Sequence, residues 1–163
     1  MLIVCRTESF SMPKLILLDT GVLGMVVHPN ARVNFDPIRW LESHLQSGNS
    51  VIVPEIADYE LRRSLIRLNA QSSIQELDNL GAAIGYLALD TGSFLLAAQL
   101  WAEARLKGYA TARDAELDGD VILAAQARML ASLSPADEVV VATTNVGHLA
   151  RFTPAETWQS ITI

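Results

Sequence analysis

The chain of 163 residues contains a single cysteine, Cys5, which excludes an internal disulfide and a cysteine-rich zinc site. It also lacks an apolar run approaching the roughly 18 residues that a membrane-spanning helix requires. The first eleven residues have no long apolar segment of the kind found in secretory signals. We therefore expect a cytoplasmic protein that works in a reducing compartment and does not associate with a membrane.

Positive charge is scarce as well, because 12 Lys and Arg residues stand against 18 Asp and Glu residues, for a net charge of −6. A protein that binds nucleic acid over its whole surface is usually basic, so such a ligand would need a local basic patch. The acidic balance also suits a basic protein partner. Half of the residues are hydrophobic, which excludes a disordered chain. We expect one domain over residues 12–163, preceded by an extension over residues 1–11.

Short apolar runs alternate with stretches of helical spacing, which is typical of an α/β domain. The expected strands are 15–18, 50–53, 86–89, 138–142 and 158–163. The expected helices are 37–48, 55–68, 72–83, 92–108 and 121–133. Asp36, Thr91 and Asp118 are the expected N-caps of the first, fourth and fifth of these helices. We predict a central parallel sheet of about four to five strands flanked by helices.

The most informative acid is Asp19, which directly follows the strand 15–18. Four consecutive apolar residues are typical of a strand that is buried on both faces of a parallel sheet. Open α/β sheets bind ligands at the carboxyl ends of their strands, which is where Asp19 is placed. A carboxylate in that position needs a metal ion, a proton or a cationic partner.

Three further polar residues occupy positions that a parallel sheet brings toward the same edge. Glu60 lies on the helix after the second strand, Asp120 lies in the first turn of an apolar helix, and Asn145 follows the strand 138–142. Each also has an ordinary structural interpretation, as a solvated acid, a helix-dipole partner or a turn former. Three carboxylates gathered at one edge could not all ionise without a cation, and oxygen ligands favour Mg²⁺ or Mn²⁺ over zinc.

Four segments that contain these residues resemble the four motifs of PIN-domain ribonucleases, and most closely those of the VapC-like toxin branch. The segments are 15–20, 59–61, 120–127 and 143–149, which follow the family's order and span most of the chain. The resemblance implies a parallel sheet flanked by helices and a metal-dependent endoribonuclease that leaves a 3′-hydroxyl and a 5′-phosphate. It also implies a small antitoxin partner and a homodimer.

The resemblance assigns roles residue by residue. Asp19, Glu60 and Asp120 match the family's metal-binding acids, and Asp118 is an additional acid that could assist the metal. Asn145 stands where many members carry Asp, which removes one negative charge and leaves open whether one or two ions bind. The expected catalytic residues are therefore these three acids together with Asn145.

Other residues near the motifs have weaker assignments. Arg62, Arg63 and Arg67 follow Glu60 on the same helix and are candidates for contacts with RNA phosphate, with a solvated helix face as the alternative. The expected substrate is single-stranded or structured RNA, which such a site could bind with few base contacts. His148 matches a frequent family position, but its apolar neighbours favour a packing role.

Three other interpretations compete with this one. Asp19-Thr20-Gly21 and Asp90-Thr91-Gly92 both reproduce the Asp-Thr-Gly signature of aspartic proteases, but the second copy leads into a helix where that class needs sheet-rich lobes. A phosphatase with Asp19 as covalent nucleophile would need an acid at position 21, where this chain has glycine. A PIN-like RNA-binding module with little turnover is the non-enzymatic alternative, and Asn145 keeps it open.

Overall fold

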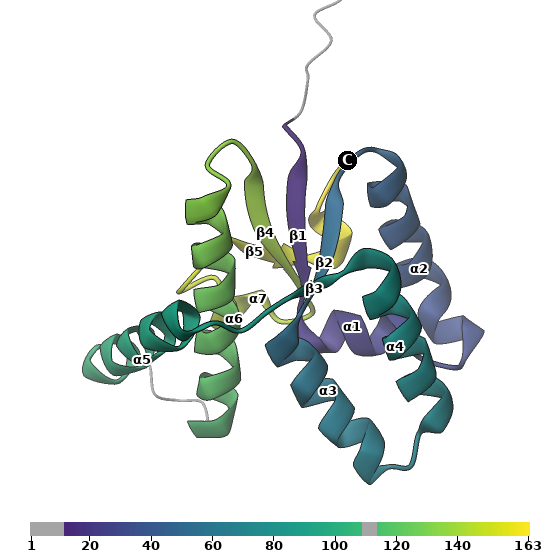
Figure 1. Cartoon of the computed structure of the whole chain (residues 1–163), viewed down its shortest axis with the longest axis horizontal. Coiled ribbons are helices and arrows are strands. Elements are labelled where there is room, and N and C mark those ends of the chain that lie inside the picture. Colours follow the sequence, from purple (N-terminus) through teal and green to yellow (C-terminus); the bar gives the residue numbers. More distant parts are fainter. Residues whose placement is uncertain (1–11, 109–113) are drawn as a thin grey trace, which may run out of the picture.

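The computed structural model describes residues 12–108 and 114–163, without the side chains of residues 114–116. The extension expected over residues 1–11 lies outside these ranges. The described residues form a central sheet with helices on both of its faces (Figure 1). Within these residues, none of the helices combines the length and apolarity needed to cross a bilayer.

Five parallel strands make up the sheet, in the order β3-β2-β1-β4-β5. The strands are β1 (Lys14–Leu18), β2 (Ser50–Pro54), β3 (Tyr86–Leu87), β4 (Glu138–Thr143) and β5 (Ala155–Thr157). The predicted α/β class and the predicted parallel sheet are thereby confirmed. Because β1 is the middle strand, the residue that follows it lies at the centre of the sheet's carboxyl edge.

The helices before and after β3 cover different parts of the sheet. They are α1 (Thr20–Val26), α2 (Ala31–Gln46), α3 (Glu55–Arg67), α4 (Gln71–Ile84), α5 (Thr91–Leu106), α6 (Asp114–Leu133), α7 (Val146–Leu149) and the 3-10 helix η1 (Trp158–Ser160). Helices α2 and α4 lie on one side of the sheet, whereas α6 lies on the other side with α5 packed outside it (Figure 1).

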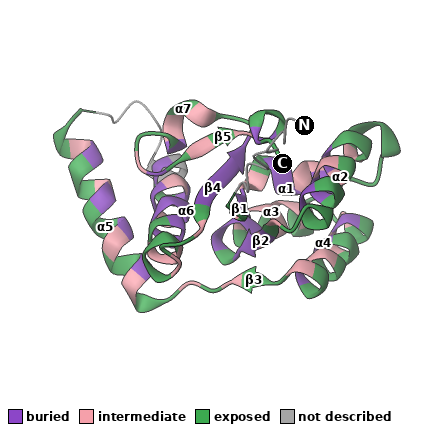
Figure 2. Ribbon diagram, turned by 90° about the horizontal axis from the view of Figure 1, so that it is seen from above, coloured by how far each residue is buried: buried purple, intermediate pink, exposed green. Residues whose placement is uncertain are grey.

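Alternating residues of β1 supply the hydrophobic clusters on the two faces of the sheet. Ile16 and Leu18 are fully buried in a cluster with residues of α1, α2 and α4. Leu17 is equally buried but packs with Leu123 and Ala127 of α6. Successive side chains of a strand point to opposite faces, so an uninterrupted apolar run is what a strand covered on both sides requires. Figure 2 shows buried residues along the strands and on the helix sides that face them.

Two predicted helix starts are wrong. Helix α2 begins at Ala31 rather than at Pro37, because Asn30 Oδ1 accepts a hydrogen bond from the Arg32 N–H at 2.9 Å and caps an earlier turn. Pro37 is buried inside the helix, where its packing compensates for the backbone hydrogen bond that proline cannot donate. Helix α5 begins at Thr91, but its N-cap is Asp90, whose Oδ1 accepts from the Ser93 N–H at 2.6 Å.

Three further expectations differ from the structure. Helix α6 begins at Asp114, so Asp118 lies inside it and is not its N-cap. The strand expected over 86–89 is limited to Tyr86–Leu87, the two residues that pair with β2. The strand expected over 158–163 is wrong, because the last strand is β5 and Trp158 then enters the core from a 3-10 turn.

Candidate active site

The structure brings four predicted site residues to one hollow at the carboxyl edge of the sheet. This hollow has a volume of about 350 Å³ and is lined by Asp19, Glu60, Asp120, Asn145, His148 and Leu149. These residues come from segments that are far apart in the sequence. They meet because β1 pairs with β4, and because α3, which follows β2, contacts α6.

Asp19 is held by hydrogen-bond donors on both of its carboxylate oxygens. The Thr20 N–H donates to Oδ1 at 2.7 Å, and the Thr143 hydroxyl donates to Oδ2 at 2.7 Å. The Asp19 N–H itself donates to the carbonyl of Ala142 at 3.0 Å, which continues the pairing of β1 with β4 by one residue. The end of β1 and the end of β4 therefore fix this carboxylate together.

Glu60 reaches the hollow from α3. Its Oε2 accepts a hydrogen bond from Thr20 Oγ1 at 2.8 Å, and its Oε1 lies 3.9 Å from Nη2 of Arg63. The side chain is 24% exposed, so it is shielded from water on most of its surface. Thr20 joins the two acids, because its backbone N–H binds Asp19 and its hydroxyl binds Glu60.

The surroundings of Asp120 oppose its ionisation. Burial raises the pKa of its carboxyl from 3.8 to about 6, and the neighbouring Asp19 and Glu60 add to the increase. His148 opposes the increase, since its Nδ1 lies 3.4 Å from Asp120 Oδ2. His148 was expected to pack among apolar residues, but it lines the hollow with its side chain 40% exposed.

Asn145 contributes an amide at the exposed rim of the hollow. It occupies the N-cap position of α7, but its side chain makes no capping hydrogen bond to that helix. Its backbone N–H instead donates to Thr143 Oγ1 at 3.0 Å. The amide side chain is therefore available for a ligand in the hollow.

The donor set suits a hard divalent cation. Three carboxylates and one amide line the hollow, and oxygen donors of this kind bind Mg²⁺ and Mn²⁺. Across residues 12–108 and 114–163, no three His, Cys, Asp or Glu side chains are gathered closely enough to hold an ion as they stand. Each of the three carboxylates is turned toward a protein partner instead, namely Thr143, Thr20 and His148. A cation would draw them together and would offset the repulsion that raises the pKa of Asp120.

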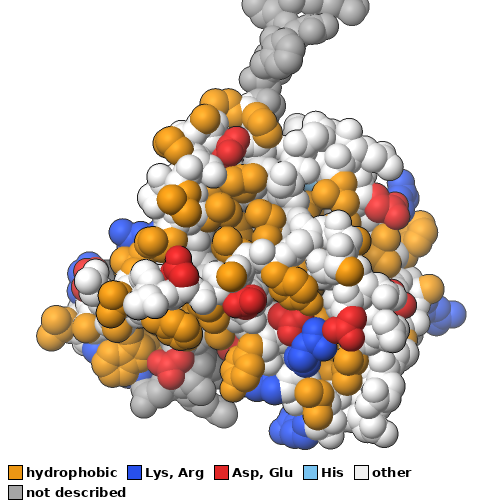
Figure 3. Space-filling model, in the orientation of Figure 1, with side chains coloured by type: hydrophobic (Ala, Val, Ile, Leu, Met, Phe, Trp, Pro, Cys, Tyr) orange, Lys and Arg blue, Asp and Glu red, His pale blue; other side chains and the backbone are white. Residues whose placement is uncertain are grey.

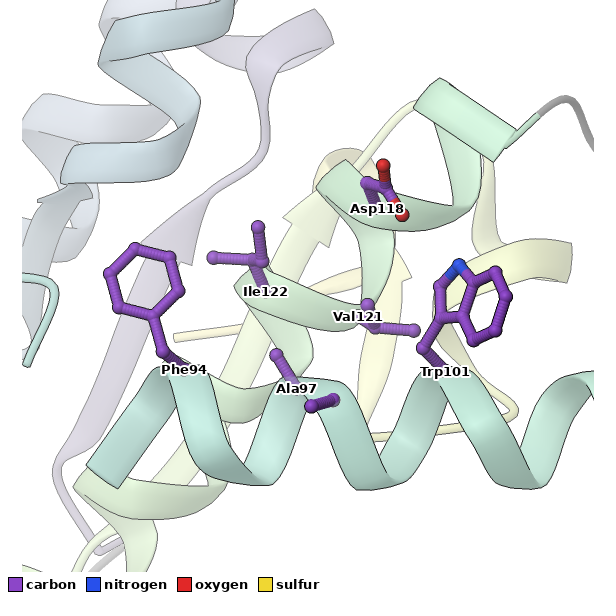
Figure 4. A pocket seen from close by; sticks show the side chains of 7 residues that line it. Phe94, Ala97, Trp101, Asp118, Val121 and Ile122 are labelled. Atoms are coloured by element: carbon purple, nitrogen blue, oxygen red, sulfur yellow. The ribbon is translucent and has the colours of Figure 1, made fainter. Parts of the chain in front are cut away.

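The structure does not bring Asp118 to this hollow. Asp118 lines a separate apolar hollow between α5 and α6, with a volume of about 370 Å³. Figure 4 shows Phe94, Ala97 and Trp101 on α5 facing Val121 and Ile122 on α6, with Asp118 beside them. Hydrophobic side chains gather over this part of the surface (Figure 3), and Phe94, which lines the hollow, is 51% exposed.

The three candidate RNA-binding arginines have different surroundings. Arg62 donates to both carboxylate oxygens of Asp58, at 2.6 and 2.8 Å, and its Nη1 lies 2.8 Å from Asp78 Oδ1. These partners raise the pKa of Arg62 further and tie its guanidinium to α3 and α4. Arg63 is 54% exposed and lies over the ring of Tyr59, and Arg67 is exposed in the last turn of α3. The last two are the more exposed, and Arg63 approaches Glu60 only at 3.9 Å, so both can reach a phosphate.

Two residues that organise the site were not singled out from the sequence. Thr20 and Thr143 donate to the carboxylates of Glu60 and Asp19, and both lie inside the motif segments 15–20 and 143–149. The register of β1 and β4 pairs Leu18 with Ala142, which places Thr143 opposite Asp19. That register was the signal that could have identified Thr143.

No family model matches the sequence, and no curated protein matches it. Solved structures do match over most of the chain. A chain of VapBC2 from Rickettsia felis, in a crystal structure with a DNA fragment from their promoter, is 17% identical, with a TM-score of 0.65 over 88% of this chain and 98% of that one. A chain of VapBC-1 from nontypeable Haemophilus influenzae is 18% identical, with a TM-score of 0.64 over 90% of this chain and 99% of that one.

A third match has the same extent. A chain of DNA-bound VapBC from Salmonella typhimurium is 19% identical, with a TM-score of 0.64 over 90% of this chain and 99% of that one. The protein therefore has the fold of these matched chains over 88–90% of its length. The resemblance to the VapC-like branch, predicted from four short motifs, is confirmed at the level of the fold.

Proposed function

We propose that this protein is a Mg²⁺- or Mn²⁺-dependent endoribonuclease that acts as the toxin of a type II toxin–antitoxin pair. The observation that carries the proposal is the convergence of Asp19, Glu60, Asp120 and Asn145 on one hollow at the carboxyl edge of the sheet. The shared fold with chains of VapBC structures supports the assignment to a toxin.

Asp19, Glu60 and Asp120 would hold the divalent ion. When bound, such an ion activates water and neutralises charge that develops on a phosphodiester. The protein's own contribution is to hold the acids before the substrate arrives, which Thr20 and Thr143 do through hydrogen bonds to two of the carboxylates. Asn145 presents an uncharged amide that can hydrogen-bond a phosphate oxygen without adding repulsion.

The reaction we propose is hydrolysis of an RNA phosphodiester. Water attacks phosphorus in line with the leaving oxygen, the P–O3′ bond breaks, and the products carry a 3′-hydroxyl and a 5′-phosphate. The exposed Arg63 and Arg67 lie on the same helix as Glu60 and would bind flanking phosphates of single-stranded or structured RNA.

The test is cleavage of a single-stranded RNA by the purified protein. We expect cleavage with Mg²⁺ or Mn²⁺, loss with EDTA, recovery on adding Mn²⁺ back, and no activity in Asp19→Asn. Asp118→Asn is the matched control, because Asp118 lies on the same helix as Asp120 but lines a different hollow. Cleavage that persists in EDTA would contradict the proposed metal dependence.

A catalytically weak RNA-binding module is the second candidate. It is favoured by the uncharged Asn145 and by the protein partners that each carboxylate already has. Protein that binds RNA but never cuts it in Mn²⁺ would establish this alternative. The phosphatase interpretation is disfavoured, since Gly21 cannot act as the second acid.

The antitoxin partner and the homodimer belong to the same proposal. Exposed apolar side chains on α5, including Phe94 and Leu95, provide a surface that a protein partner could cover. The net charge of −6 suits a basic antitoxin. Analytical sedimentation of the wild type and of the Phe94→Ser variant, each measured separately, tests whether the chain forms a dimer. Co-purification with the product of an adjacent reading frame tests the antitoxin.

A further inference from the structure

Gly119 occupies the interior of α6, directly before Asp120, and is buried. Its backbone does not require glycine, because the glycines with positive φ among the described residues are Gly48, Gly85 and Gly108. Glycine weakens a helix interior relative to alanine. The reason for glycine at this position therefore lies in the space around it.

The Glu60 carboxylate fills the space that a side chain at position 119 would occupy. A Cβ there would overlap Glu60 Oε1 and would lie 3.0 Å from Cδ and 3.2 Å from Oε2. The hydroxyl of Thr20 donates to Oε2 at 2.8 Å and thereby holds the carboxylate in place. The Glu60 carboxylate thus lies between Thr20 of α1 and the backbone of α6.

We propose that Gly119 is a positioning residue, whose missing side chain creates the seat for the Glu60 carboxylate beside Asp120. The inference rests on the proposed metal-binding role of these two acids. A methyl group at position 119 would displace the carboxylate, because the nearest atoms are the far end of the Glu60 side chain rather than backbone. Glycine lowers the helix propensity of α6 at position 119, but it leaves room in the site for the Glu60 carboxylate from α3.

The test is a cycle of four proteins: wild type, Gly119→Ala, Glu60→Ala and the double variant, each titrated with Mn²⁺ alone by calorimetry. We expect Gly119→Ala to weaken Mn²⁺ binding by about 10- to 100-fold, as for other residues that orient metal ligands. In the Glu60→Ala background the same change should alter the affinity by less than about twofold, since no carboxylate remains to be displaced. Equal losses in both backgrounds, or unchanged binding in Gly119→Ala, would overturn the proposal.

Gly24→Ala is the matched control. Gly24 also lies inside a helix, but a Cβ there would have Leu61 Cδ1 as its nearest neighbour, at 3.4 Å, which is ordinary contact. We expect this variant to bind Mn²⁺ as the wild type does. Weakened binding in Gly24→Ala would show that any glycine-to-alanine change affects the site, and would overturn the assignment to Gly119.

Urea unfolding in EDTA separates this inference from the proposed function. Without metal, Gly119→Ala should raise the urea midpoint more in the Glu60→Ala background than in the presence of Glu60, where the methyl and the carboxylate compete. A wild type that binds no Mn²⁺ would contradict the proposed function. The role of Gly119 would then be tested by the urea midpoints alone. If Gly119→Ala raised the urea midpoint equally with and without Glu60, the proposed positioning role of Gly119 would be overturned.

Discussion

The Thr143 hydroxyl donates to Asp19 Oδ2 at 2.7 Å and accepts a hydrogen bond from the Asn145 N–H at 3.0 Å. Thr143 has no exposed surface, so water cannot replace either bond. One buried hydroxyl therefore fixes an acid at the end of β1 and the amide residue that follows β4. This relationship couples the stability of the sheet edge to the geometry of the proposed site.

Thr143→Val should impair both properties. It removes the hydroxyl while keeping a β-branched side chain of similar size, and leaves Asp19 and the Asn145 N–H without their partner. We expect the free energy of unfolding to fall by about 1–3 kcal/mol and RNA cleavage to fall by about 10- to 100-fold. Urea denaturation and a cleavage assay provide the measurements. Thr143→Ser keeps the hydroxyl and should retain most of the activity, and a Ser variant as impaired as the Val variant would argue for packing instead.

Asp120→Asn should stabilise the metal-free protein. Because burial raises the folded-state pKa of Asp120 from 3.8 to about 6, protonation contributes stability that is complete below about pH 4 and lost as the pH rises through 6. At pH 7.5 the ionised carboxylate therefore costs up to about 3 kcal/mol, and asparagine avoids this cost. Urea unfolding in EDTA measures the gain.

Saturating Mg²⁺ should reverse the order of the two proteins. Magnesium at 1,000 times its dissociation constant would stabilise the wild type by about 4.1 kcal/mol, which exceeds the cost of the ionised carboxylate, and Asp120→Asn should gain little. Asp118→Asn should behave as the wild type in both conditions, since Asp118 lines the apolar hollow instead. If neither Mg²⁺ nor Mn²⁺ raised the stability of the wild type, the proposed metal site would be contradicted.

The arginines of α3 should separate stability from RNA binding. Arg62→Ala removes an ion pair whose Asp58 side chain is only 11% exposed, so we expect a loss of about 2 kcal/mol in stability. Arg63→Ala and Arg67→Ala should change stability by less than about 0.5 kcal/mol. They should instead weaken binding of single-stranded RNA and reduce the slope of log K against log salt by roughly 0.7 for each phosphate that the protein no longer neutralises. If Arg62→Ala weakened RNA binding and left the stability unchanged, the separate roles assigned to these arginines would be refuted.

His44 should make stability depend on pH. Its ring is 1% exposed; Nε2 lies 3.2 Å from the Ile161 carbonyl, and Nδ1 accepts from Asn49 Nδ2 at 2.9 Å. Burial lowers the pKa of His44 below 6.5, although the bond to Ile161 opposes this, so the folded protein keeps the ring neutral.

The contribution of His44 is complete above about pH 6.5 and is lost as the pH falls toward the lowered pKa. We expect the difference in urea midpoint between wild type and His44→Gln to shrink between pH 7.5 and pH 5. Other titrating groups are common to both proteins and cancel in this difference. A difference that stays constant or grows on acidification would show that His44 is not held neutral.

Sequence patterns predicted the elements whose burial is periodic. The run that ends at Leu18 and the strand around Val140 were recognisable because both faces of each strand are covered, which leaves no polar position in the run. The predicted helix starts were wrong where a single capping hydrogen bond determines the first residue of the helix. Asn30 and Asp90 start their helices through a single hydrogen bond to a nearby N–H, and Asp36 and Thr91 are equally good caps by composition.

The site divides in the same way. Asp19, Glu60, Asp120 and Asn145 could be selected because each occupies a position that a parallel sheet places at its carboxyl edge. Asp118 could not be excluded from the sequence, because it lies only two residues before Asp120. The 3.6-residue period of α6 turns it toward α5 instead, into the hollow with Phe94.

The sequence by itself determined the class of the fold and the residue types of the site, since both follow from periodicity and from the chemistry of acids at strand ends. Only the tertiary structure decided which donors hold those acids. Thr20 and Thr143 hold the acids through hydrogen bonds between residues that are 40 and 124 positions apart in the sequence. Gly119 also acts through a contact with a distant segment. Such contacts depend on strand register and helix packing, which no local pattern encodes.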